Sequence, residues 1–129
     1  LYFLQTKEYD NENDNSNVIY TELNGYKFMF MGDAGVDKEK DILEKYNLSD
    51  IDVLKVGHHG SKTSSSKYFI NKTEPKYAII SVGKNNRYGH PKESVLNNLV
   101  NTKIYRTDED GSVMFKIKNN KLKKVTCSP

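Results

Sequence analysis

Apolar residues occur along the chain in short runs separated by polar segments, and each run predicts one structural element. The first two runs, Val18–Leu23 and Tyr26–Met31, flank Asn24-Gly25. This pair readily adopts the positive φ angles of a tight turn, so it predicts a β-hairpin. The second run is nearly all apolar, and we expect its strand to be buried on both faces. Residues 6–17 are polar and acidic, which predicts an exposed loop.

Further along the chain, segments with helical spacing alternate with short apolar strands. We expect one helix over Asp37–Asn47 with Asp37 as its N-cap, a second after the hydroxyls of Ser64–Ser66, and a third that starts at Pro91. The strands between and after these helices are expected at Asp52–Val56, Tyr77–Val82, Lys103–Arg106, Val113–Lys118 and Leu122–Val125. The resulting order, ββαβαβαβββ, predicts a single α/β domain over residues 1–129, with helices covering a sheet.

Four side chains suited to catalysis or metal binding directly follow predicted strands. Asp33 follows the second strand of the hairpin, His58 and His59 follow the next strand, and His90 follows the one after that. These three histidines are all that the chain contains. Because ligands gather at the carboxyl ends of strands in α/β sheets, we expect the four side chains to lie near one another. Imidazoles grouped with a carboxylate are typical of divalent-metal hydrolases.

Each of these residues also has a plain structural interpretation. A carboxylate directly after a glycine, as at Asp33, is common in turns, and His90 is placed to cap the next helix. On an extended backbone His58 and His59 would point to opposite faces, but the glycines on either side permit a tight loop that brings both to one site. One imidazole would then bind a metal while the other orients water or shuttles a proton.

Two loops beside the histidines carry groups suited to an anion. Ser61 and Lys62 begin a hydroxyl-rich loop before the second helix, where side-chain and backbone N–H groups can donate to an oxyanion. Simple helix capping is the structural alternative for the later serines of that loop. The second loop, just before the last histidine, offers Asn86, Arg87 and Tyr88.

Charge is distributed unevenly along the chain. Residues 1–54 contain 5 Lys or Arg and 12 Asp or Glu, whereas residues 55–129 contain 15 Lys or Arg and 5 Asp or Glu. A basic part that also carries the histidines suggests an anionic substrate, although a solvated lysine-rich surface has the same composition. Cys127 is the only cysteine, so the chain forms no internal disulfide and no cysteine-based zinc site. No apolar run approaches the ~20 residues of a membrane helix.

Together these motifs resemble the C-terminal half of the metallo-β-lactamase-fold hydrolase domain of ComEC/Rec2-type DNA-internalisation competence proteins. The segments Gly57–Ser61 and Asn86–Pro91 carry the resemblance most specifically, and the match runs nearly from end to end. It implies a partial αββα sandwich and a bacterial origin. It also implies that the chain is a soluble domain, tethered to a membrane protein in the full-length parent. It also implies hydrolysis of phosphodiesters by metal-activated water in the complete domain.

The resemblance further implies a role for each candidate residue. Asp33 matches the metal-bridging aspartate of these proteins, His58 and His59 match their paired histidines, and His90 matches their final histidine. We therefore expect Asp33 and His58 to be metal ligands and His59 and His90 to be catalytic, with Zn²⁺ or Mn²⁺ as the metal. The expected contacts to substrate phosphate are Ser61, Lys62, Asn86, Arg87 and Tyr88.

One motif of that family is missing. The main metal-binding motif, H-x-H-x-D-H, does not occur in the chain. We therefore expect the N-terminal half of the domain to act as a partner that supplies the remaining ligands. The isolated chain should be inactive, bind metal weakly, and self-associate through an uncovered sheet. The alternative is a non-catalytic module that binds nucleic acid through its basic half and has no cofactor.

Overall fold

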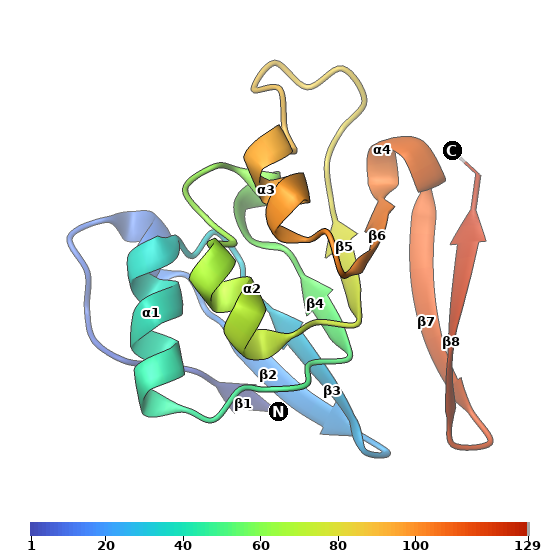
Figure 1. The fold of residues 1–129 in the computed structure, drawn as a ribbon, viewed down its shortest axis with the longest axis horizontal. Coiled ribbons are helices and arrows are strands. Elements are labelled where there is room, and N and C mark those ends of the chain that lie inside the picture. The colour runs from blue at the N-terminus through green and yellow to red at the C-terminus, as the bar shows by residue number, and fades with distance from the viewer. Residues whose placement is uncertain (129) are drawn as a thin grey trace.

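The framework of the protein is a six-stranded sheet. The computed structural model describes residues 1–128, and the strands lie in the order β1-β2-β3-β4-β5-β6 (Figure 1). Strands β1, β2 and β3 pair antiparallel, whereas β3, β4, β5 and β6 pair in parallel. The bounds are β1 Tyr2–Phe3, β2 Ile19–Leu23, β3 Tyr26–Phe30, β4 Val53–Lys55, β5 Tyr77–Ile80 and β6 Lys103–Arg106.

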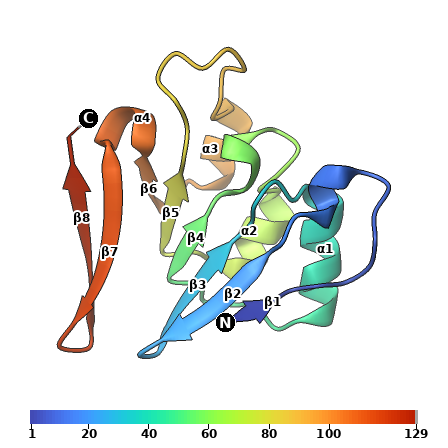
Figure 2. The same cartoon turned by 180° about the vertical axis from the view of Figure 1, so that it is seen from behind.

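Three helices cover one face of this sheet. Helices α1 (Val36–Lys45), α2 (Lys67–Thr73) and α3 (Glu93–Asn98) all lie on the same side, as the two opposite views show (Figures 1 and 2). Each follows one of the strands β3, β4 and β5 and returns the chain to the next parallel strand. The predicted α/β class is therefore confirmed. The observed order also contains the short strand β1 and the one-turn helix α4 (Thr107–Asp110).

The two faces of the sheet differ in burial. Met29, Leu54 and Ala78 are register neighbours on the face covered by the helices, and all three are fully buried. The opposite face carries Phe28 and Phe30, and Phe30 is 42% exposed. Our expectation that this strand is buried on both faces was therefore wrong at Phe30, because the helices cover only one side.

A separate two-stranded hairpin lies beside the second face. It consists of β7 (Ser112–Lys118) and β8 (Lys121–Cys127) (Figure 2). Phe115 packs its ring against Tyr77 at 5.3 Å and Tyr105 at 6.2 Å between centroids. At the hairpin turn, the hydroxyl of Tyr26 donates to the carbonyl of Asn120 at 2.9 Å. These contacts orient the hairpin relative to the sheet.

The polar segment before β2 is more ordered than the sequence predicts. It contains the 3-10 helix η1 (Glu12–Asn15), and it packs along α1. Tyr9 donates its hydroxyl proton to Asp41 at 2.5 Å, and burial together with this bond raises the pKa of Tyr9 to about 12. Lys38 is fully buried beneath the segment, and burial lowers its pKa. Asp14 is also buried, so the prediction of a wholly exposed loop was wrong there.

Two helices begin where the sequence did not predict. Helix α1 starts after Gly35, and the predicted N-cap Asp37 lies inside its first turn. Helix α3 starts after Lys92, so neither Pro91 nor His90 belongs to it or caps it. The second helix does begin at the predicted serines, since the hydroxyl of Ser66 accepts from the backbone of its first turn at 3.2 Å. Across residues 1–128, no helix is both long and apolar enough to cross a membrane.

An ion pair fixes the turn that leads into the hairpin. Arg106 Nε and Nη2 donate to the two carboxylate oxygens of Asp108 at 3.0 and 2.6 Å, and this bonding holds the pKa of Asp108 below its ordinary value of 3.8. At neutral pH, Asp108→Asn should lower the free energy of unfolding by about 1 kcal/mol.

The pH dependence of this difference has a defined sign. Because the pKa of Asp108 is lowered in the folded protein, its contribution is complete above 3.8 and is lost as pH falls through the folded-state pKa. Thermal unfolding of protein and variant should therefore converge in acid. Asp10→Asn is the control, since that side chain is exposed and takes part in none of the ion pairs found in residues 1–128. A difference that persists undiminished in acid would contradict the assignment.

Candidate functional site

The candidate residues lie at one edge of the sheet because three neighbouring parallel strands end there. Asp33 comes after β3, the turn with His58 and His59 comes after β4, and the loop with His90 comes after β5. The backbone N–H of His58 donates to the carbonyl of Gly32 at 2.9 Å, which ties the first two strand ends together. We call this group of four residues the histidine edge.

The paired histidines occupy a tight turn of unusual backbone geometry. The turn is the 3-10 segment η2 (Gly57–Gly60), in which His58 has φ 45° and ψ 44° and His59 has φ 55° and ψ 24°. With this geometry the His58 ring lies 6.0 Å from the ring of His90 and 6.5 Å from that of His59, between centroids. Both imidazoles therefore reach the same edge, as the flanking glycines allow.

His59 is oriented by the neighbouring strand end. Its Nδ1 lies 2.7 Å from the carbonyl oxygen of Ser81, which can only accept a hydrogen bond. Nδ1 therefore carries a proton in this contact, and in the neutral form of the ring Nε2 is the nitrogen with the lone pair. Since the side chain of His59 is exposed, this nitrogen can accept a proton or bind a ligand from solvent.

His90 is held by its own loop. The side chain of Asn86 bonds both backbone groups of His90, each at 2.8 Å, and also donates to the carbonyl of Gly83 at 3.2 Å. Tyr88 stacks on the imidazole with a centroid distance of 5.7 Å. Burial lowers the pKa of His90, and the charges of Lys92 and the other two histidines lower it further. His90 is thus neutral at neutral pH and able to accept a proton.

The remaining candidates differ in how free their side chains are. Arg87 donates to the hydroxyl of Tyr88 at 2.7 Å and lies over its ring, while Ser61 is buried with its hydroxyl 3.1 Å from that of Thr63. Lys62 is exposed on the same turn. The amide of Asn86 is committed to its own loop, so of this group Lys62 and Arg87 offer the most accessible positive charge.

A groove of about 430 Å³ runs beside Asp33 and His58, and it contains a residue that the sequence did not single out. Asp14 lines this groove, is 5% exposed, and accepts from the backbone of Gly35 at 2.7 Å. It was missed because its segment is polar and acidic, so nothing in the sequence distinguishes Asp14 from its acidic neighbours. Lys55 was missed for a different reason. In the sequence Lys55 is simply part of a predicted strand. In the structure, burial lowers the pKa of Lys55, while the negative charge of Asp33 raises it.

The described residues do not form a complete metal site by themselves. Among residues 1–128, no three His, Cys, Asp or Glu side chains lie close enough together to hold a metal ion. Zinc sites in proteins use three or four such ligands. Asp33 and His58 therefore amount to part of a ligand set at most, and we derive no reaction step through a metal from them.

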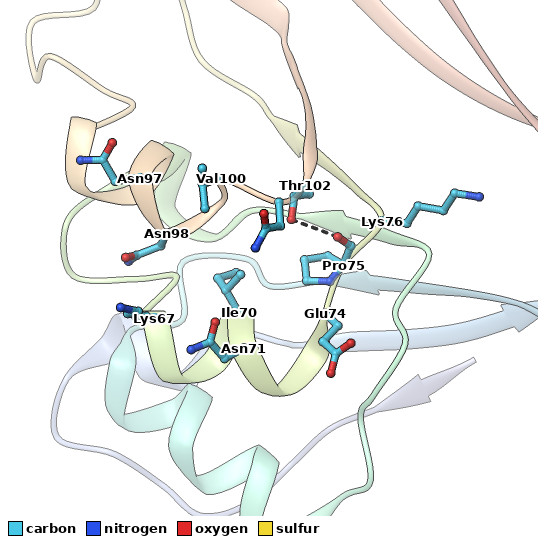
Figure 3. Close-up of a pocket in the computed structure, with 11 residues that line it drawn as sticks. Lys67, Ile70, Asn71, Glu74, Pro75, Lys76, Asn97, Asn98, Val100 and Thr102 are labelled. Atoms are coloured by element: carbon cyan, nitrogen blue, oxygen red, sulfur yellow. Dashed lines mark hydrogen bonds between the residues drawn. The ribbon is translucent and has the colours of Figure 1, made fainter.

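Another hollow of the protein lies away from the histidine edge. It has a volume of about 600 Å³ and lies between α2 and α3, as the close-up shows (Figure 3). Its lining is rich in amides, with Asn71, Asn97, Asn98 and Asn101. None of the candidate residues lines it, so it does not enlarge the candidate site.

Comparison with known proteins identifies three similar sequences, whereas no family model matches the chain. ComE operon protein 3 of Bacillus subtilis is 41% identical over 110 residues, which cover 84% of this chain and 14% of that protein. Competence protein ComA of Neisseria gonorrhoeae is 40% identical over 119 residues, 88% of this chain and 17% of that protein. Recombination protein 2 of Haemophilus influenzae is 40% identical over 88 residues, 68% of this chain and 11% of that protein.

Proposed function

Because the chain is homologous to a segment of these competence and recombination proteins, we propose that it takes part in the handling of DNA during its uptake. The chain spans less than a fifth of the length of each relative, so it corresponds to one segment of those longer proteins. The names of the relatives suggest the process, whereas the reaction has to be inferred from the residues of the histidine edge.

We further propose that the histidine edge belongs to a phosphodiesterase or nuclease of the metallo-β-lactamase type. The observation that carries this proposal is the convergence of three imidazoles and one carboxylate from three adjacent strand ends. Asp33 and His58 would contribute to a divalent-metal site, with Zn²⁺ or Mn²⁺ as the candidates. The N-terminal half of the complete domain would supply the other ligands.

The chain's own groups suggest how a phosphodiester would be handled. His90 is neutral at neutral pH and can accept a proton, and the free Nε2 of His59 is a second proton acceptor. Arg87 and Lys62 are exposed cations on the two loops beside these imidazoles and would attract the phosphate. Asn86 and Tyr88 would act mainly by holding His90 in place.

The test is DNA uptake in competent cells that depend on the protein. His58→Ala and His90→Ala should each reduce transformation by about tenfold or more, because the first removes a proposed metal ligand and the second a proposed proton acceptor. Lys72→Ala is the control, since Lys72 is exposed on α2, outside the histidine edge. Immunoblots and thermal unfolding would verify that all variants are made and folded. Normal transformation with both histidine variants would overturn the proposed role of the edge.

A second function, nucleic-acid binding without hydrolysis, is favoured by the surplus of positive charge in residues 55–129. The same cells distinguish the two functions. If the edge is catalytic, the histidine variants should still bind DNA but fail to process it. If the protein only binds DNA, both steps should be unaffected by these substitutions.

A further inference from the structure

Four lysines form two opposed pairs on the outer face of the β7–β8 hairpin. Strand register places Lys116 opposite Lys123 and Lys118 opposite Lys121, and directly opposed residues of an antiparallel pair share one face. All four side chains are exposed. We call this surface the lysine face.

The inner face of the hairpin fixes which way the lysine face points. Residues between the four lysines alternate to the other side, where Phe115 packs on Tyr77 and Tyr105. Lys124 lies opposite Phe115 in the register and places its ammonium 4.8 Å from the centre of the Tyr105 ring. The fifth lysine of the hairpin is thus used for packing, and the other four point away from the sheet.

The lysine face has no acidic partner. Residues 112–128 contain five lysines and no aspartate or glutamate. The ion pairs found in residues 1–128 involve Lys7 and Arg106, and none involves a lysine of the hairpin. Like charges placed directly opposite each other destabilise a strand pair, and a two-stranded hairpin is only marginally stable. An anionic partner that spans both lysine pairs would relieve this repulsion.

We propose that the lysine face binds the phosphate backbone of a nucleic acid, independently of base sequence. Lysines two residues apart on one strand are about 7 Å apart, and opposed lysines about 5 Å, so the face presents four charges to a regularly charged polymer. A two-stranded ribbon also fits the width of the major groove of duplex DNA. The choice of DNA as the nucleic acid rests on the proposed function. The arrangement of the lysines comes from the strand register and is independent of that function.

The lysine face is separate from the histidine edge. The hairpin turn lies toward the end of the sheet opposite to the loop that carries His90, as both views show (Figures 1 and 2). Tyr26 bonds the turn at Asn120, beside the turn of the first hairpin. A nucleic acid bound to the lysine face would therefore be held at a point distant from the reacting phosphate. Such a contact would position the nucleic acid and would not take part in the reaction.

The test measures binding of a fluorescent DNA duplex by anisotropy over a series of salt concentrations. One variant carries Lys116→Gln, Lys118→Gln, Lys121→Gln and Lys123→Gln. The matched control removes the same charge from exposed lysines on or beside α1 and α2, with Lys40→Gln, Lys67→Gln, Lys72→Gln and Lys76→Gln. The hairpin variant should bind about tenfold more weakly or worse at low salt. Its plot of log affinity against log salt should be less steep by about 3 to 4.

Three outcomes would overturn the proposal. Equal weakening in the control variant would show that only net charge matters, and unchanged affinity in the hairpin variant would show that the lysine face is not used. Binding to vesicles of anionic lipid but not to DNA would assign the face to a membrane surface. Single-stranded DNA in a parallel series distinguishes the form of nucleic acid preferred.

Failure of this inference can be told apart from failure of the proposed function. If the hairpin variant binds DNA normally while His58→Ala abolishes transformation, only the lysine face is wrongly assigned. If the hairpin variant loses DNA binding while the histidine variants transform normally, the lysine face stands and the role of the histidine edge fails.

Discussion

Gly60→Ala is expected to lower the free energy of unfolding by about 4 kcal/mol and to reduce transformation to background. Gly60 has φ +79°, which costs an alanine about 1–2 kcal/mol. A Cβ at this position would also lie 2.6 Å from Cβ and 3.0 Å from Cα of Pro91. Relieving that overlap adds about 1–3 kcal/mol to the destabilisation. The combined loss is large compared with the free energy of unfolding of a typical protein, which is about 5–15 kcal/mol.

The overlap matters for function because it joins two parts of the histidine edge. Gly60 ends the turn of His58 and His59, and its carbonyl accepts from the backbone of Lys92 at 2.9 Å, just after His90. A Cβ at Gly60 would push the two histidine-bearing segments apart. Both the paired histidines and His90 should therefore be displaced by a single methyl group.

Gly83→Ala provides the matched control for this prediction. Gly83 lies at the start of the His90 loop, has no atom within 4 Å of an added Cβ, and does not have a positive φ. Its replacement should change the free energy of unfolding by less than about 0.5 kcal/mol. Urea denaturation of both variants measures the difference. A Gly60→Ala protein as stable as the Gly83→Ala protein would refute the close contact with Pro91.

Glu39→Ala should destabilise the protein by about 3 kcal/mol, because it removes the carboxylate that accepts from one buried and one partly buried backbone N–H group. Glu39 lies on α1, is 1% exposed, and accepts hydrogen bonds from the backbone of Ser65 and of Ser66, the latter at 3.0 Å. Burial raises the pKa of Glu39, and the two N–H donors oppose that effect. Without the carboxylate the loop before α2 would lose its anchor on α1.

Two further variants sharpen this measurement. Glu44→Ala, on the exposed side of the same helix, should change stability by less than about 0.5 kcal/mol. Glu39→Gln keeps one oxygen acceptor and should lose an intermediate amount. Equal stability of Glu39→Ala and Glu44→Ala in urea denaturation would contradict the anchoring role.

The sequence predicted the order of elements and the meeting of the histidines for the same physical reason. Buried strands carry nearly continuous apolar runs, and the residues that follow parallel strands must emerge at one edge. Asp33, His58 and His90 are brought to that edge by three such strands. The pattern of apolar runs therefore predicted both the fold class and the proximity of the candidate residues.

Burial that depends on distant contacts was harder to predict. Asp14 lies in a polar segment, residues 6–17, whose one aromatic residue is Tyr9, and its burial depends on a backbone N–H of Gly35 that folding brings near. Phe30 belongs to an apolar run, but its exposure depends on how far the hairpin reaches across the second face. Strand alternation in Val113–Lys118 predicted a strand but could not say which sheet it would join.

Helix starts illustrate the same limit on a smaller scale. Asp37 has a preferred capping side chain, yet α1 begins two residues earlier because the carboxylate of Asp14 and the carbonyl of Thr63 bond the backbone there. Local preference was outweighed by contacts with residues far away in the chain.

The left-handed backbone at His58 and His59 lowers the stability of the folded protein. A side chain with a Cβ is disfavoured in that conformation, by about 1–2 kcal/mol for each residue, whereas glycine adopts it freely. A sequence optimised for stability alone would therefore place glycine at both positions. The chain instead retains two imidazoles side by side and forgoes that stability, which is what the proposed role of the histidine edge would require.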